Sequence, residues 1–313
     1  MKIEELYHVI HLTEDRAPLD AWYDEVFQPR RGFMDANYYN GEQRDASLVT
    51  IADAVVEVLA PARFAEGWEA MPIGRFFTRF GRHWHSIAWY VADVGEAWDH
   101  LRSHGLRVIF PGGAPGDDTR PSGATPIFTH PKETLTQLQF TWRRPVHGAE
   151  EFATRSDDPR YLPGWSSGWW ADNHPLGIKR LAYLTIVTAD PAQARAVYAD
   201  ILGGEVLASG TSALTATEDM YVQVGPQTIV QISRPDEQPS LARADLDQHG
   251  SMLHAVAFEV RDLDEAESHL RTHDIGVVSR DDYTLLVDPA DTFGAAYRFT
   301  TKAITWQEAA PGS

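Results

Sequence analysis

The hydrophobic and polar positions of the chain repeat one pattern four times: an apolar run, an aspartate, then apolar residues at helical spacing. The runs read HVIHLTED from His8, HSIAWYVAD from His85, YLTIVTAD from Tyr183 and HAVAFEVRD from His254. The aspartate follows the first residue of its run by 7, 8, 7 and 8 positions, so the second pair of runs repeats the first. The pattern predicts four copies of a strand–helix–three-strand (βαβββ) unit.

The aspartate that closes each run is placed to begin a helix. Its carboxylate can accept hydrogen bonds from the free backbone N–H groups of the first helical turn. The four residues are Asp15, Asp93, Asp190 and Asp262. Apolar residues at helical spacing then extend the predicted helices to Phe27, Leu101, Leu202 and Leu270.

Short strands follow the helices. They are predicted at residues 32–38, 47–51 and 54–60 in the first unit, and at 205–208, 220–224 and 228–233 in the third. Residues 143–177 lack periodicity and are rich in Trp, Pro, Gly and Ser. This segment is predicted to connect two halves, with its tryptophans packing it against them.

Composition narrows the classes of function. The 313 residues include 45 acidic and 27 basic side chains, a formal net charge of -18, which disfavours binding to nucleic acid or an anionic membrane. There is no apolar run long enough for a membrane span and no secretory signal at the N-terminus, so a cytoplasmic protein is expected. The absence of cysteine leaves oxygen and imidazole groups as metal ligands.

The four-unit arrangement resembles the vicinal oxygen chelate superfamily, which includes glyoxalase I, extradiol dioxygenases, methylmalonyl-CoA epimerase and bleomycin-resistance proteins. The resemblance implies an α+β fold in which βαβββ units pair into cupped mixed sheets. It further implies two glyoxalase-like domains, at residues 1–145 and 178–305, joined by a connector at 146–177. In this family a divalent metal lies in the cup, held by the first and last strands of the units.

The family positions of the first half hold residues that can bind a metal. They are His8 and Glu57 in the first unit and His85 and Gln137 in the second, where glutamine replaces the usual glutamate. This set suits one Zn, Ni, Mn, Co or Fe(II) ion. The resemblance also makes Glu57 the candidate proton-transferring base. Whether the site lies in one half or bridges units stays open.

The second half holds Tyr183, Gln231, His254 and Arg298 at the same positions, which do not form a divalent-metal site. His254 is instead expected to line a substrate pocket. His83 alternates onto the same strand face as His85 and is expected, with Trp89, to contact substrate.

Three functions fit the sequence. The first is a metal enzyme that stabilises an enolate or oxyanion of a small oxygen-rich substrate, as an isomerase, lyase or epimerase does. The second is an extradiol-type Fe(II) dioxygenase, with His8, His85 and Glu57 as its facial triad. The third is a resistance-type binding protein that presents aromatic residues such as Trp84 and Trp89. A small-molecule substrate is the expected partner, and a homodimer is allowed.

Overall fold

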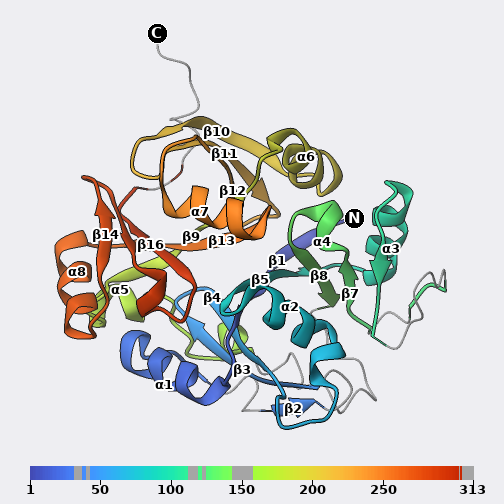
Figure 1. Ribbon diagram of the computed structural model, residues 1–313, viewed down its shortest axis with the longest axis horizontal. Helices are drawn as coiled ribbons and strands as arrows, with labels where there is room; N and C mark the ends of the chain where they lie inside the picture. Colours follow the sequence, from blue (N-terminus) through green and yellow to red (C-terminus); the bar gives the residue numbers. More distant parts are fainter. Residues whose placement is uncertain are drawn as a thin grey trace.

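The strands form two mixed sheets with the same topology (Figure 1). The computed structural model describes residues 1–31, 37–39 (backbone only), 43–111, 119–121, 125–142, 158–302 and 304. Within these residues each sheet has eight strands, in the orders β2-β3-β4-β1-β5-β8-β7-β6 and β10-β11-β12-β9-β13-β16-β15-β14. In both sheets two parallel pairs flank a central antiparallel pair, β1–β5 or β9–β13. The predicted α+β fold with two cupped sheets is confirmed.

The strands of the first sheet are β1 (Ile3–Leu12), β2 (Asn37–Tyr39), β3 (Arg44–Ile51), β4 (Ala54–Pro61), β5 (His83–Val91), β6 (Val108–Ile109), β7 (Ile127–Thr129) and β8 (Gln137–Trp142). Those of the second are β9 (Ile178–Val187), β10 (Glu205–Ser212), β11 (Thr217–Val224), β12 (Thr228–Pro235), β13 (Met252–Val260), β14 (Val277–Arg280), β15 (Thr284–Val287) and β16 (Ala296–Thr300). The strands predicted at 47–51, 54–60, 205–208, 220–224 and 228–233 are confirmed. Most of the strand predicted at 32–38 lies outside the described residues.

The α-helices are α1 (Arg16–Phe27), α2 (Pro72–Phe80), α3 (Val94–Ser103), α4 (Pro131–Thr134), α5 (Trp169–Asn173), α6 (Pro191–Arg195), α7 (Leu241–His249) and α8 (Leu263–Thr272). Short helical turns lie at η1 (Trp68–Ala70), η3 (Pro159–Tyr161), η4 (Ala196–Ile201) and η5 (Pro289–Asp291). Among the described residues, no helix is both long and apolar enough to cross a membrane.

The four aspartate caps are confirmed. The carboxylates of Asp15, Asp93, Asp190 and Asp262 each accept a backbone N–H from the first turn of α1, α3, α6 and α8. The sequence pattern did not predict α2 and α7. These two helices lead into β5 and β13, the central strands that begin the second and fourth units.

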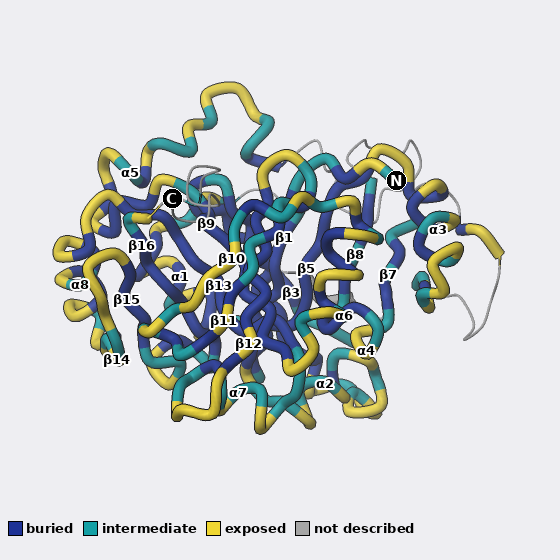
Figure 2. The backbone as a smooth tube through the Cα atoms, turned by 90° about the horizontal axis from the view of Figure 1, so that it is seen from above, coloured by how far each residue is buried: buried dark blue, intermediate teal, exposed yellow. Residues whose placement is uncertain are grey.

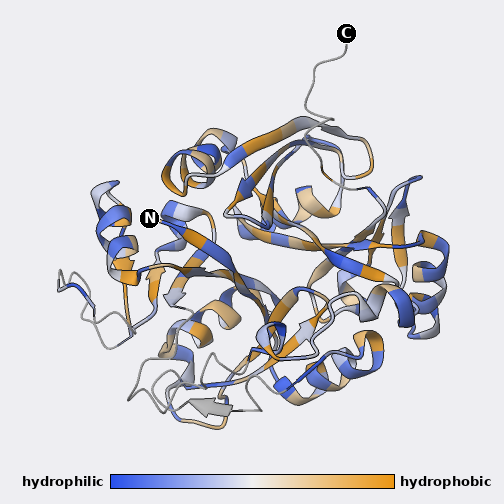
Figure 3. Cartoon of the chain, turned by 180° about the vertical axis from the view of Figure 1, so that it is seen from behind, coloured by the Kyte–Doolittle hydropathy of each residue, from blue (hydrophilic) through white to orange (hydrophobic). Residues whose placement is uncertain are grey.

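The two sheets share one hydrophobic core. Aromatic side chains of α1 reach the second sheet, where Phe27 lies 6.0 Å from Phe258 between ring centroids. The indole of Trp84 on β5 donates to the carbonyl of Ala296 on β16, at 2.9 Å. Figure 2 shows the buried backbone concentrated in the strands, and Figure 3 shows hydrophobic segments alternating with hydrophilic ones along them.

The connector packs against the body where the structure describes it. The indole of Trp170 is buried and donates to the carbonyl of Phe27 at 2.8 Å. Trp165 is half-buried and packs against the core, whereas Trp169 is exposed. The prediction of a packed connector holds for residues 158–177, while 143–157 lie outside the described residues.

His11 provides a pH-sensitive contact between the halves. Its ring accepts the hydroxyl of Tyr23 at Nδ1 (2.9 Å) and approaches the carbonyl of Phe293 through Nε2 (3.2 Å), so this network needs the neutral imidazole. Burial lowers the pKa of His11 from 6.5 to about 3.

Acid should therefore destabilise the protein through His11. Between pH 6.5 and about 3 the unfolded chain binds a proton at this histidine that the folded chain excludes. The contribution of neutral His11 to the free energy of unfolding is fully present above pH 6.5. It is lost as the pH falls, by about 1.4 kcal/mol per pH unit. Urea unfolding of the native protein and His11→Gln at pH 7 and 5.5 measures it. Between pH 7 and 5.5 the native protein should lose more stability than His11→Gln. His104→Gln changes an exposed histidine and should lose as much stability as the native protein. Parallel losses in all three proteins would contradict the assignment.

Candidate metal centre

A carboxylate with three histidines around it lies where α7 meets the start of β5. Helix α7 begins after Ser240, whose hydroxyl accepts the backbone N–H of Arg243, and ends at His249. Asp245 and His249 are one turn apart and therefore share a helix face. The Nδ1 atom of His249 lies 2.6 Å from Oδ1 of Asp245.

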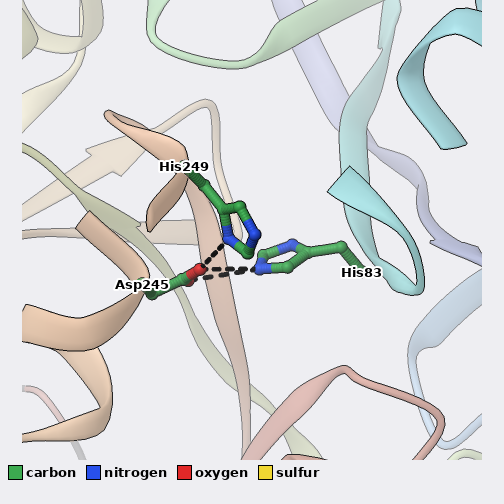
Figure 4. Close-up of side chains that lie close together, drawn as sticks. All are labelled: His83, Asp245 and His249. Carbon is green, nitrogen blue, oxygen red and sulfur yellow. Dashed lines mark hydrogen bonds and ion pairs between the residues drawn. The ribbon is translucent and has the colours of Figure 1, made fainter. Parts of the chain in front are cut away.

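His83 reaches this carboxylate from the other half of the chain (Figure 4). Its Nε2 lies 3.0 Å from Oδ1 of Asp245, and its Nδ1 lies 2.9 Å from the carbonyl oxygen of Trp84. A carbonyl oxygen can only accept, so Nδ1 carries the proton that fixes the ring. Nε2 is the atom left to bind a proton or a metal in front of Asp245.

His254 completes the cluster from β13. Its Nδ1 lies 2.6 Å from Oδ2 of Asp245, the oxygen that Nε2 of His83 approaches at 3.2 Å. Burial opposes ionisation of Asp245, but hydrogen bonds from His254 and His83 outweigh it and hold the pKa of the carboxyl well below its usual range. Burial lowers the pKa of His254, and Asp245 offsets part of that shift. An ionised carboxylate thus faces three imidazoles.

His83, Asp245 and His249 can hold a divalent cation. One ligand atom from each lies within 4.8 Å of the others, and in the described part of the chain no other three His, Asp or Glu side chains do so. The bond from His83 Nδ1 to a backbone carbonyl is the usual arrangement of a metal-binding histidine. Nε2 of His249 is buried without a hydrogen-bond partner among the described residues, so protein groups do not saturate the cluster. The donor set fits a metal.

The ligands predicted in the first half are not gathered in this way. Nε2 of His8 lies 3.2 Å from Oε2 of Glu57, whose other oxygen accepts from Arg44 at 3.1 Å. Burial raises the pKa of Glu57, and Arg44 partly opposes the shift. His85 does not join His8 and Glu57 at ligand spacing. Its ring packs 4.4 Å from that of Phe76, and burial lowers its pKa to about 4. Gln137 begins β8 opposite Ser86.

The residues predicted to contact substrate, His83, His254 and Trp89, do not lie together in one pocket lining. His83, expected to contact substrate, is a candidate ligand, and His254 supports the ligand carboxylate. Trp89 is fully buried in the shared core, where its indole donates to Thr228 at 3.3 Å. A substrate contact by Trp89 is therefore unsupported.

Asp245 and His249 were missed because α7 was not predicted. The signal present in the sequence was their i, i+4 spacing, followed by His254 five residues later. Spacing of this kind places two ligands on one helix face, but it does not show that a histidine 162 positions away approaches them.

Comparisons with known proteins agree with the fold. Residues 180–299 match the model of the Glyoxalase/Bleomycin resistance protein/Dioxygenase superfamily. A mutant of 4-hydroxymandelate synthase from Streptomyces coelicolor is similar over 99% of this chain and 97% of its own, with a TM-score of 0.65 and 12% identity. The family model covers less than half of the chain, so it relates residues 180–299 to this superfamily, while the likeness to the synthase shows the fold of the whole chain. The matched family segment contains Asp245, His249 and His254.

A second solved structure is similar to part of the chain. Methylmalonyl-CoA epimerase from Mycobacterium tuberculosis is 22% identical over 39% of this chain and 87% of its own, with a TM-score of 0.37. No curated protein matches the sequence significantly. The likeness to the synthase shows the fold alone, so the activity is argued from the site.

Proposed function

We propose that this protein is an Fe(II)-dependent enzyme of the dioxygenase type, with the metal held by His83, Asp245 and His249. The observation that carries the proposal is the donor set: two imidazoles and one carboxylate at ligand spacing. Two histidines and one carboxylate are the ligands of non-haem Fe(II) oxygenases, which keep other coordination positions open. The family description includes dioxygenases, and the full-length structural likeness is to 4-hydroxymandelate synthase.

Fe(II) bound at this set would supply the centre at which dioxygen is activated. The residues of the chain would orient it. The carbonyl of Trp84 fixes the His83 ring with Nε2 toward Asp245, and the helical spacing fixes His249 beside the same oxygen. His254 holds the second oxygen of Asp245, which keeps the carboxylate from rotating.

This proposal favours the second of the three functions expected from the sequence, with different ligands. An isomerase, lyase or epimerase was predicted to use His8, Glu57 and His85, which do not meet as a three-ligand group. A binding protein without metal would not require an ionised carboxylate among three imidazoles, since such a buried charge is costly unless it is used or compensated.

The proposal can be tested without knowledge of the substrate. Metal-free protein should bind about one Fe(II) per chain anaerobically, and nitric oxide should then give the EPR signal of a ferrous nitrosyl. Nitric oxide reports an open coordination position on Fe(II) because it binds where dioxygen would. His249→Ala should lose the signal, whereas His104→Ala, at an exposed histidine, should keep it. Bound Fe(II) without a nitrosyl signal would indicate a closed, structural site and would contradict the proposal.

A further inference from the structure

A buried arginine lies on the same sheet as this centre. Arg298 on β16 is 2% exposed, and its guanidinium is charged at all physiological pH values. Among the described residues no carboxylate lies within 4 Å of it as an ion-pair partner. Its Nη1 donates to Oε1 of Gln231 at 2.7 Å, and the guanidinium also contacts the side chain of Tyr183. Its Nη2 is buried without a hydrogen-bond partner there. An uncompensated buried charge of this kind is strongly unfavourable.

The neighbours of Arg298 hold the guanidinium in place but do not neutralise it. Oε1 of Gln231 also accepts the hydroxyl of Thr185 at 2.7 Å, so both of its lone pairs are used. The amide nitrogen of Gln231 donates to Tyr221 at 3.0 Å. The amide is therefore oriented with its oxygen toward Arg298 and has no further acceptor to offer.

Small and apolar groups lie beside Arg298. Ala257 on β13 pairs with Arg298 on one side and with Tyr183 on the other, and the side chains of Arg298 and Tyr183 contact each other. Tyr183 and Ala257 belong to a small buried apolar cluster with Ala182, Leu207 and Ile229. Burial raises the pKa of Tyr183, and the charge and hydrogen bond of Arg298 offset only part of that shift, so the hydroxyl stays protonated and can donate.

We infer that Arg298 binds the carboxylate of a small organic acid whose apolar part packs against Tyr183 and its cluster. A singly charged planar carboxylate matches the N–H groups of a guanidinium. The apolar surroundings disfavour a doubly charged phosphate, whose desolvation costs more.

The anion site is close to the candidate metal centre. Arg298 pairs with Ala257 on β13, and the same strand carries His254, which contacts Asp245. The inference depends on the proposed function in one respect: it takes the bound acid to be the substrate of the metal centre. Binding of the carboxylate itself needs no metal, so the two claims can fail separately.

The test uses the full chain freed of metal by a chelator, with benzoate as the probe and benzamide as its neutral analogue. Isothermal titration calorimetry should show benzoate binding at least about tenfold more tightly than benzamide, because a hydrogen bond to a charged group is lost with the amide. Arg298→Met should lower benzoate affinity by a similar factor. Arg234→Met, at an exposed arginine on β12 that pairs with Glu218, is the matched control and should bind as native.

Several outcomes would overturn the inference. They are equal affinity for benzoate and benzamide, unchanged benzoate binding in Arg298→Met, or equally tight binding of inorganic phosphate. The comparison of benzoate with benzamide on native protein requires no variant, so it holds even if Arg298→Met fails to fold. Benzoate binding by a protein that gives no ferrous nitrosyl signal would support this inference while refuting the proposed function.

Discussion

Asp245→Asn should weaken Fe(II) binding by more than about a hundredfold. Asparagine keeps the shape and one oxygen but removes the negative charge that faces His83 and His249. Loss of a group that only supports a ligand already costs about 10–100-fold in metal affinity, so loss of the anionic ligand itself should cost more. Equilibrium dialysis of Fe(II) under anaerobic conditions measures the effect.

Two further variants make this result specific. Asp247→Asn changes a carboxylate on the same helix that is more than half exposed and pairs with Arg243, so it should bind Fe(II) as native. Glu57→Gln tests the site predicted in the first half and should also retain the metal. If Glu57→Gln loses the metal while Asp245→Asn keeps it, the ligands are those of the first half and the centre proposed here is wrong.

The fold could be predicted from the sequence because its signals are local. Each unit begins with an apolar run and an aspartate whose capping role depends on the next three residues, and all four caps are present. The repeat then fixes the order of the strands, since two equivalent units form equivalent halves of each sheet.

The site could be predicted only in part because it depends on register and on contacts between the halves. Strict alternation would place His85 and Ile87 on one face of β5. A register shift lies between their positions in the β1–β5 pairing, so Ile87 enters the shared core while His85 faces Phe76 on α2. A one-residue irregularity changes the face on which each side chain lies.

The meeting of His83 with Asp245 had no local signal. It depends on how the two sheets pack and on α7. This short helix consists mostly of polar residues, so no hydrophobic pattern indicates it. His254, by contrast, occupies a family position and was identified as a site residue. Its interaction with Asp245 places it in a cluster to which both halves of the chain contribute.

Arg160→Met should lower the free energy of unfolding by about 3–5 kcal/mol, the usual cost of leaving one partner of a buried ion pair alone. Arg160 lies in the connector and is 2.7 Å from the carboxylate of Asp158, which is fully buried. The same guanidinium donates to the carbonyls of Leu6 on β1 and Asp53 before β4, at 2.8 and 3.2 Å. Its loss would leave a charge and two carbonyls uncompensated.

A double-mutant cycle tests whether the pair is the cause. Asp158→Asn combined with Arg160→Met should cost less than the sum of the single changes, because the double variant no longer buries the charge of Asp158 without its partner. Arg234→Met, at an exposed ion pair, should change stability by no more than about 0.5 kcal/mol. Urea unfolding at pH 7 gives all four values. Additive costs would mean that Arg160 acts through its backbone contacts alone. A cost below about 1 kcal/mol for Arg160→Met would show that the connector does not depend on Arg160 for its attachment to the first sheet.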